Sequence, residues 1–346
     1  MAVGGRGYAQ RPLRFLIAAV VCLLVVSGSS SAGGPAAVEG GGRADVEGRW
    51  FAPTSPWNTR IPASTPIVRQ SWAWMRALND TIAHININRT AWTPTILIAR
   101  GSVPRGTVKL PNGWRLSDVP LSPRFAPSSD SDRHAVVIDT VRGRMYDFFG
   151  LGPDPQGGWS AQAGVVMRLW GSGWYNGRYC KQQLCGPWGA RSSSAALGGG
   201  LIRASEVKAG VIPHALACAA PKHLIGPPVS PATTSDGSGG GGAIPMGARL
   251  QLDPNVSVSS MGLEPGEEMI ARALQTYGAY IVDSSSSFAC YARNVAHLQS
   301  NPYPASWSNG ITESLLANMR VVAAPAPPQY DTRAVFGQPS RQPASS

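Results

Sequence analysis

The chain has 346 residues, of which 14% are charged, and its formal net charge at pH 7 is +11. The basic residues are scattered and are not interleaved with aromatic residues along any one element, so the composition predicts no nucleic-acid-binding surface. Beyond the N-terminal segment, no apolar run reaches the roughly 20 residues that a membrane-spanning helix needs. The sequence therefore predicts no membrane association after that segment is removed.

The N-terminal segment has the pattern of a secretory signal peptide. Three arginines precede an apolar run over residues 15–26, and small residues follow at 29–33, where a signal peptidase would cleave. We therefore expect a signal peptide over residues 1–32 and a flexible, glycine-rich leader over residues 33–47. The mature protein is expected to be secreted, with a net charge of +8 once the three arginines are removed.

The remaining chain predicts one domain over residues 48–322 and a disordered tail, rich in Pro, Ala and Ser, over residues 323–346. The first helix is expected after Thr65, which can cap it, with Pro66 at its first position. Val68, Trp72, Met75 and Ile82 recur at helical spacing, so this helix is expected to face the core.

The next part of the chain has the pattern of short strands. An apolar run occupies residues 95–99, and residues 134–138 and 144–149 flank a turn, which predicts a hairpin. A further strand is expected within residues 159–169. Several short strands with turn signals between them are typical of a sandwich or jelly roll.

The stretch at residues 201–218 is the focus of the sequence. Ser205 can cap a single helical turn that Gly210 ends, after which His214 and its apolar neighbours alternate as in a strand. One imidazole is thus expected on an apolar face. It is either a satisfied core residue or part of a site.

The C-terminal third predicts two strands and two helices around a glycine-rich loop at residues 230–242. Strands are expected at 244–252 and 279–283, a helix at 265–277 and a short helix at 311–319. Together these elements predict a mainly β fold, with sandwich or jelly-roll-like sheets and two or three short helices packed on them.

Four cysteines remain after signal cleavage, and an even number in an exported chain favours two disulfides. Three pairings are possible. We favour Cys180 with Cys185, which closes a short loop, and Cys218 with Cys290, which joins distant segments. A zinc site built from four thiolates is a weaker alternative because the spacing lacks paired C-x-x-C elements, so no metal and no cofactor are predicted.

Aromatic residues gather in the loop-rich centre of the chain. Flat rings beside amide and guanidinium groups suit sugar rings, which present apolar C–H faces between hydroxyls. The alternative is that these rings fill the core beneath the loops. The predicted substrate-binding residues are Trp170, Trp174, Tyr175, Trp188 and Arg191.

A few titratable side chains lie on strand faces that are otherwise apolar. His134 and Asp147 occupy the two strands of the predicted hairpin, and an unpaired polar group on such a face costs stability. Contacts between His134 and Asp147, or between His214 and a carboxylate, would relieve that cost and would also form acid–base pairs. The predicted catalytic residues are His134, Asp147, Glu206, His214, Arg249 and Tyr280.

Two mechanisms fit these candidates. A glycosidase needs two carboxylates at a defined separation, which Asp147, Glu206 and Asp283 could supply. A polysaccharide lyase would use a histidine or tyrosine to abstract a proton beside a uronate, while Arg249 neutralises the substrate carboxylate. The basic net charge slightly favours an acidic substrate.

Several short elements also occur together in a broad group of exported bacterial proteins, which the chain resembles between residues 50 and 290. The Gly-x-Ile-x-His-Ala-Leu element at 210–216 is the most specific of them. The others include Ser-Pro-Trp-Asn at 55–58, Pro-Met-Gly-Ala-Arg at 245–249, and the segment at 273–283. The resemblance implies the extent of the domain and assigns no activity.

The leading functional hypothesis is a secreted, carbohydrate-active protein that cleaves a cell-wall or extracellular polysaccharide, as a hydrolase or a lyase. The first alternative is a non-catalytic protein that binds the cell wall or a carbohydrate, in which the histidines are structural. A second alternative is a purely structural envelope protein, which would leave the polar groups on apolar faces unexplained. The sequence does not predict an oligomeric state.

Overall fold

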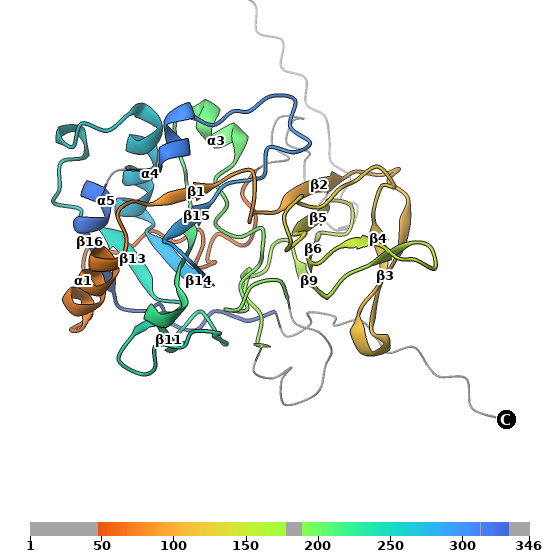
Figure 1. Cartoon of the computed structure of the whole chain (residues 1–346), viewed down its shortest axis with the longest axis horizontal. Coiled ribbons are helices and arrows are strands. Elements are labelled where there is room, and N and C mark those ends of the chain that lie inside the picture. Colours follow the sequence, from red (N-terminus) through yellow and green to blue (C-terminus); the bar gives the residue numbers. More distant parts are fainter. Residues whose placement is uncertain (1–47, 178–188, 312, 332–346) are drawn as a thin grey trace, which may run out of the picture. The chain divides into compact units, whose positions relative to one another are not determined.

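The structure is a computed structural model that describes residues 48–177, 189–311 and 313–331 (Figure 1). The predicted signal peptide and leader, Cys180, Cys185 and Trp188 lie outside the described residues. Every described residue belongs to one compact unit that begins at Arg43. Within these ranges, no helix is long and apolar enough to cross a membrane.

The described residues are mainly β, as the sequence predicts, and the strands form several mixed sheets. The largest sheet has six strands, and its central strand β10 runs parallel to β14 and antiparallel to β15. In spatial order its strands are β1 (Asn86–Asn88), β15 (Ala289–Tyr291), β10 (Leu216–Pro221), β14 (Ala279–Ser285), β13 (Arg249–Leu252) and β16 (Met319–Val322).

Three smaller sheets complete the β structure. The predicted hairpin is confirmed as β5 and β6, and β2 joins β5 in parallel. The first sheet contains β2 (Thr95–Ala99), β5 (Ala135–Asp139), β6 (Arg144–Phe149) and β9 (Ala163–Arg168). The second contains β4 (Arg115–Pro120), β3 (Arg105–Lys109), β8 (Trp159–Ser160) and β7 (Gly152–Pro153), and the third pairs β11 (Ile225–Pro228) with β12 (Ile244–Met246).

Four short α-helices occur in the described ranges: α1 (Ser71–Thr81), α3 (Ala204–Ala209), α4 (Pro265–Thr276) and α5 (Glu313–Ala317). Helix α4 confirms the predicted signals, because Pro265 takes its first position and Glu264 and Glu267 form a capping box. Short 3-10 turns occupy Pro111–Gly113, Lys222–Leu224, Val258–Ser260 and Ala305–Asn309.

The first helix differs from its prediction. It begins at Ser71, because the preceding residues pair with β16: Ile67 forms an antiparallel bridge with Val322, and the Val68 N–H donates to the Val321 carbonyl at 2.9 Å. Trp72 is 71% exposed, so its predicted place in the core is wrong. Pairing with a distant strand overrides the local helix signals.

The central stretch is confirmed in part. Helix α3 ends at Gly210, which adopts a left-handed conformation with φ +70°, as the predicted stop requires. Strand β10 begins at Leu216 rather than Ile212, so His214 lies in the connection between α3 and β10. That connection is tied to a distant segment, because the Ala215 N–H donates to the Trp57 carbonyl at 2.7 Å.

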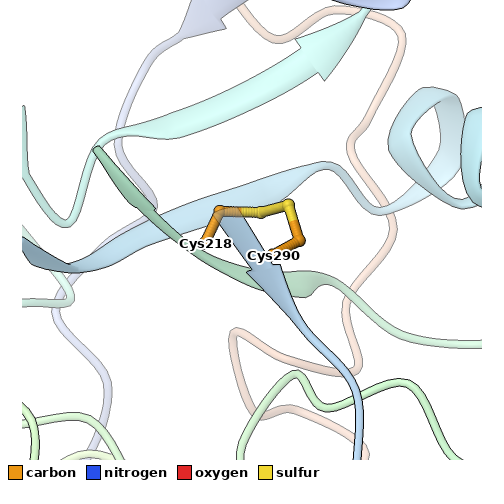
Figure 2. Close-up of a disulfide and its surroundings, with 2 residues drawn as sticks. All are labelled: Cys218 and Cys290. Atoms are coloured by element: carbon orange, nitrogen blue, oxygen red, sulfur yellow. A yellow bond between two sulfur atoms is a disulfide. The ribbon is translucent and has the colours of Figure 1, made fainter. Parts of the chain in front are cut away.

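The predicted disulfide between Cys218 and Cys290 is confirmed (Figure 2). The two residues are direct partners in the antiparallel pairing of β10 with β15, and their Cα atoms are 4.0 Å apart. The bond therefore joins the strand that follows His214 to the strand that ends at Tyr291.

Residues 323–331 of the predicted C-terminal tail belong to the described chain, and residues 332–346 lie outside it. The Asp331 N–H donates to the Trp174 carbonyl at 2.8 Å, and the buried Asp331 carboxylate accepts the Arg168 N–H at 2.7 Å. Disorder from residue 323 is thus a wrong prediction for residues 323–331, because these contacts fix the segment despite its low apolar content.

Candidate active site

The described titratable residues form two groups at which chemistry could occur. We call Arg203, Glu206 and His214 the Glu206 cluster. We call His134, Asp147, Arg191, Asp283 and Tyr291 the Arg191 cluster, because each of the other four residues interacts electrostatically with Arg191. The first group arises from α3 and the loop after it. The second is brought together by the sheets.

The Glu206 cluster is fully bonded at its carboxylate. One Glu206 oxygen accepts the Arg203 backbone N–H at 2.8 Å, which closes the N-terminus of α3. The other oxygen, Oε1, contacts the Arg203 guanidinium and lies 3.0 Å from His214 Nε2. This confirms the predicted contact between His214 and a carboxylate.

Electrostatics favour the ionised form of Glu206. Burial alone would raise its pKa, but the charge and hydrogen bond of His214, followed by those of Arg203, lower the pKa to about 2. His214 Nδ1 lies 2.9 Å from the carbonyl of Ala215. Both ring nitrogens of His214 thus face acceptors, an arrangement that is satisfied when both carry hydrogen.

A pocket of about 320 Å³ lies over the Glu206 cluster. Its lining includes three aromatic rings, those of Trp50, Phe51 and Trp57, together with the three cluster residues. The Arg203 guanidinium also lies 5.3 Å from the centre of the Trp50 ring. Because neither nitrogen of His214 is left for a ligand, the cluster is built to fix the chain rather than to transfer protons.

The position of Asp147 in the Arg191 cluster is set by the register of the β5–β6 hairpin. Val136 on β5 pairs directly with Asp147 on β6, so the face that carries His134 and Val136 is also the face of Asp147. This face packs into the larger hydrophobic cluster, which includes Val136, Met145 and Val165. Asp147 is consequently fully buried.

Asp147 has one satisfied and one unsatisfied oxygen. Its Oδ2 accepts the Leu197 N–H at 2.6 Å, whereas Oδ1 has no hydrogen-bond partner among the described residues. Burial raises the pKa of Asp147 to about 7, although the Leu197 N–H and the charge of Arg191 act to lower it. A buried carboxyl group can therefore gain or lose a proton near neutral pH.

Arg191 lies at the centre of this cluster. Its Nη1 donates to the carbonyls of Ala196 and Gly199 at 2.9 and 2.8 Å, and its Cζ is 5.2 Å from the centre of the Tyr291 ring. Nη2 has no hydrogen-bond partner among the described residues. Burial lowers the pKa of Arg191, whereas Tyr291, Asp283 and Asp147 raise it.

Asp283 comes from β14, beside the central strand of the large sheet. Its Oδ1 accepts hydrogen bonds from the Ser192 hydroxyl at 2.9 Å and from the Ser284 N–H at 3.1 Å. Burial raises the pKa of Asp283 to about 6, with Ser192 and Arg191 acting to lower it and Asp236 acting to raise it. The Asp236 carboxylate accepts a hydrogen bond from the Ser284 hydroxyl at 2.5 Å.

Arg191, Ser192, Asp236 and Asp283 belong to the lining of a pocket of about 500 Å³, which we call the Asp283 pocket. Arg191, Asp236 and Asp283 supply its charged side chains. Its remaining polar lining consists largely of hydroxyl residues, and Phe149 and Tyr175 add aromatic surface. A pocket of this size with a few converging polar groups, one of them with a shifted pKa, has the character of a ligand site.

His134 does not make its expected contact with Asp147. It is buried, and neither ring nitrogen has a hydrogen-bond partner among the described residues. The nearest ion-pair partner of Nδ1 is Asp132, at 4.0 Å. Burial lowers the pKa of His134 to about 4, with Asp130 acting to raise it and Arg191 to lower it, so its ring is neutral at pH 7.

Arg249 and Tyr280 lie together in a different part of the core. Arg249 donates to the carbonyls of Tyr277 and Thr59 and packs over the Tyr280 ring at 5.2 Å. Burial raises the pKa of Tyr280 to about 12, and its hydroxyl lies 3.4 Å from the Pro56 carbonyl. Neither residue lines the Asp283 pocket or the pocket over Glu206.

The aromatic loop residues take three different positions. Trp174 is fully buried and stacks on Trp57 with ring centres 5.1 Å apart, so the prediction that its face binds a sugar is wrong. Tyr175 is also buried, and its hydroxyl accepts the Gly189 N–H at 2.9 Å at the lining of the Asp283 pocket. Trp170 is 63% exposed and packs on Gly143, away from that pocket.

Sequence reasoning missed Asp236 and Ser192. Asp236 lies in the glycine-rich segment that predicts a flexible loop, and Ser192 lies in a run of serines. A local signal was present for Asp236, since it is the one acid in its polar loop. Its contact with the residue after Asp283 depends on long-range packing, which no local pattern reveals.

No group of His, Cys, Asp and Glu side chains within the described ranges is arranged to hold a metal ion. Comparisons with known proteins found no matching family model, no matching curated protein and no matching solved structure. The functional argument therefore depends on the chemistry of the site.

Proposed function

We propose that the protein is a secreted carbohydrate-active enzyme that hydrolyses a glycosidic bond of a cell-wall or extracellular polysaccharide in the Asp283 pocket. One observation carries the proposal. Two carboxylates, Asp236 and Asp283, line one pocket and interact, and the pKa of Asp283 is raised to about 6. A carboxyl group with a raised pKa beside a second carboxyl group is the arrangement that general acid catalysis of glycoside hydrolysis uses.

In this mechanism Asp283 is the general acid. Its protonated form donates to the glycosidic oxygen while the bond from that oxygen to the anomeric carbon breaks, and the leaving sugar departs with the proton. Asp236 either deprotonates the attacking water, or attacks the anomeric carbon to form a glycosyl ester that a water, deprotonated by Asp283, then hydrolyses to release Asp236. The net reaction adds one water across the bond: its hydroxyl goes to the anomeric carbon of one product and its hydrogen to the leaving sugar.

Arg191 and the hydroxyl residues position the substrate in this proposal. Nη1 of Arg191 holds the Ala196 and Gly199 carbonyls, whereas the buried Nη2 has no hydrogen-bond partner among the described residues and is the atom proposed to donate to a sugar hydroxyl or carboxylate. Ser192 holds Asp283 through its hydroxyl, which fixes the carboxyl group in orientation. Tyr175 and Phe149 offer apolar surface to the sugar ring.

The same geometry favours hydrolysis over a lyase reaction. A lyase needs a side chain that can take a proton from carbon, and none of the three predicted bases, His134, His214 and Tyr280, lines the Asp283 pocket. His134 is buried outside it. The nitrogens of His214 face Glu206 and Ala215, and Tyr280 lies against Pro56. The signal-peptide pattern and the Cys218–Cys290 disulfide support secretion, since disulfides persist in oxidising compartments.

The proposal is tested with a panel of cell-wall and matrix polysaccharides. New reducing ends are measured separately from the absorbance of unsaturated uronates. We expect reducing ends without unsaturated product, and we expect Asp283→Asn to lower the rate by roughly a hundredfold or more. The wild-type rate should fall as the pH rises above about 6, because Asp283 then loses the proton that it donates.

Asp154→Asn is the matched control, because Asp154 pairs with Lys109 outside the pocket and its loss should leave the rate unchanged. Folding of each variant is checked by circular dichroism. Detection of unsaturated product would show that the reaction is a lyase reaction and not hydrolysis. Retention on a polysaccharide with neither product would favour the non-catalytic binding protein.

A further inference from the structure

We infer that a groove between α1 and β16 is a second carbohydrate site, one that holds an acidic polysaccharide by an exposed tryptophan and arginines. We call it the Trp72 groove; it has a volume of about 560 Å³. The elements that form it pack side by side, as Figure 1 shows. It shares no lining residue with the Asp283 pocket. This inference rests on the proposed carbohydrate substrate and adds a place where the polymer is held during reaction.

The groove exposes apolar surface that the fold does not use. Trp72 is 71% exposed and Ile67 is 52% exposed, although Met75 and Leu78 on the same helix are buried. The helix thus turns one apolar side to the core and leaves its indole in solvent. An exposed indole offers the flat apolar face on which a sugar ring can stack, with its polar neighbours free to meet the hydroxyls.

Charge in the groove is unbalanced toward the positive. Arg69, Arg76 and Arg320 line it, and Asp80 is the acid among its lining residues. Arg320 is already held by Gln251 and by Asp253 at 3.4 Å, so Arg69 and Arg76 are the cations proposed to meet the ligand. Arg76 lies over the Trp72 ring at 5.3 Å and 3.6 Å from Asp80. Both contacts of Arg76 are on an exposed surface, where such pairs hold weakly. Arg76 can therefore turn toward a ligand carboxylate at little cost.

Asn79 adds a polar group without a partner. Its Oδ1 atom is buried and accepts no hydrogen bond from the described residues, and Asn79 belongs to the groove lining. An amide oxygen in this position can accept a hydrogen bond from a sugar hydroxyl after a small side-chain movement. The indole, the amide and the guanidinium groups together match a uronic acid: an apolar ring face, hydroxyls and a carboxylate.

Binding is measured by affinity electrophoresis of the full chain in gels that contain polygalacturonate, alginate or hyaluronate, with pullulan as the neutral polymer. All proteins carry Asp283→Asn, so that turnover does not alter the gel and failure of the proposed hydrolysis leaves this measurement intact. We expect retardation by at least one acidic polymer and little by pullulan. Trp72→Ala, and separately Arg69→Gln with Arg76→Gln, should each weaken that binding by roughly tenfold.

Trp92→Ala is the control, because Trp92 is 50% exposed but does not line the groove. Its binding should match that of the parent protein. Three results would overturn the inference: no retardation by any acidic polymer, equal retardation by pullulan, or binding that survives Trp72→Ala. If the Asp283→Asn protein no longer hydrolyses the polymer but still binds it, that result would support the inference. It would also separate binding in the groove from the proposed reaction.

Discussion

The Glu206 cluster and the Arg191 cluster contain the same kinds of side chain and use them differently. In the Glu206 cluster, both carboxylate oxygens and both nitrogens of His214 have partners, the pKa of the acid is lowered, and Arg203 Nε is the one buried side-chain atom without a hydrogen-bond partner among the described residues. In the Arg191 cluster, Asp147 Oδ1, Arg191 Nη2 and both nitrogens of His134 have no hydrogen-bond partner among the described residues. Buried polar groups that are paired stabilise the structure. Buried polar groups without a partner lower the stability of the fold, so their presence points to function.

The substitution that tests this comparison most strongly is Glu206→Gln. The amide cannot balance the buried Arg203 guanidinium, and only one of its two polar atoms can accept a hydrogen bond, so the contacts that Glu206 makes with Arg203 and His214 are not all kept. We expect a loss of about 4 kcal/mol in the free energy of unfolding, as for other broken buried pairs, measured by urea denaturation at pH 7. Activity per folded molecule should be unchanged.

The control for this change is Glu268→Gln on α4, whose partner Arg272 is exposed. Its effect should stay within about 0.5 kcal/mol. A stable Glu206→Gln protein without activity would reverse the assignment and make the Glu206 cluster the functional one.

Replacing both Cys218 and Cys290 by alanine tests whether the two clusters are stabilised together. The disulfide closes a segment of 72 residues, and releasing it gives the unfolded chain more freedom. We expect a loss of about 3 kcal/mol. The bond joins the strand after His214 to the strand that carries Tyr291. Its loss should therefore lower the melting temperature by the same amount whether unfolding is followed by tryptophan fluorescence or by far-UV circular dichroism. Separate transitions would show that the clusters unfold independently.

The third prediction concerns pH and has opposite signs at Asp147 and Glu206. The raised pKa of Asp147 means that the folded state holds its proton up to about pH 7, so its stabilising contribution is lost as pH rises from about 4 through 7. The lowered pKa of Glu206 gives a contribution that is present above its ordinary pKa and is lost as pH falls toward about 2. His134, whose pKa is lowered to about 4, also loses its contribution on acidification below its ordinary pKa.

Asp147→Asn isolates the Asp147 part of this dependence. The difference in unfolding free energy between pH 5 and pH 8 should change by roughly 2 to 3 kcal/mol relative to the parent protein, because the asparagine cannot ionise. Urea denaturation at the two pH values measures it. An unchanged difference would show that Asp147 stays ionised throughout, and that its buried oxygen is paired in solution.

Local patterns predicted the parts of this molecule that depend on neighbours in sequence. The hairpin, the capped helix α4 and the turn at Gly210 follow from residues a few positions apart. The partners of buried groups do not. Trp174 has glycine beside it and still lies in the core against Trp57, and Asp236 meets Ser284 from a loop that looks flexible. The sequence could therefore nominate acids and histidines, but tertiary packing decides which of them are satisfied.

The order of the six-stranded sheet sets the order in which this protein can fold. Its edge strand β1 pairs with β15, and its other edge strand β16 comes near the end of the described chain. The central strand β10 has β14 and β15 as its two neighbours, and both follow it. A growing chain that has not reached residue 279 thus holds none of the neighbours of β10, and pairings between such distant segments form slowly. The sheet that carries Asp283 and Tyr291 is therefore completed only after nearly the whole domain has been synthesised.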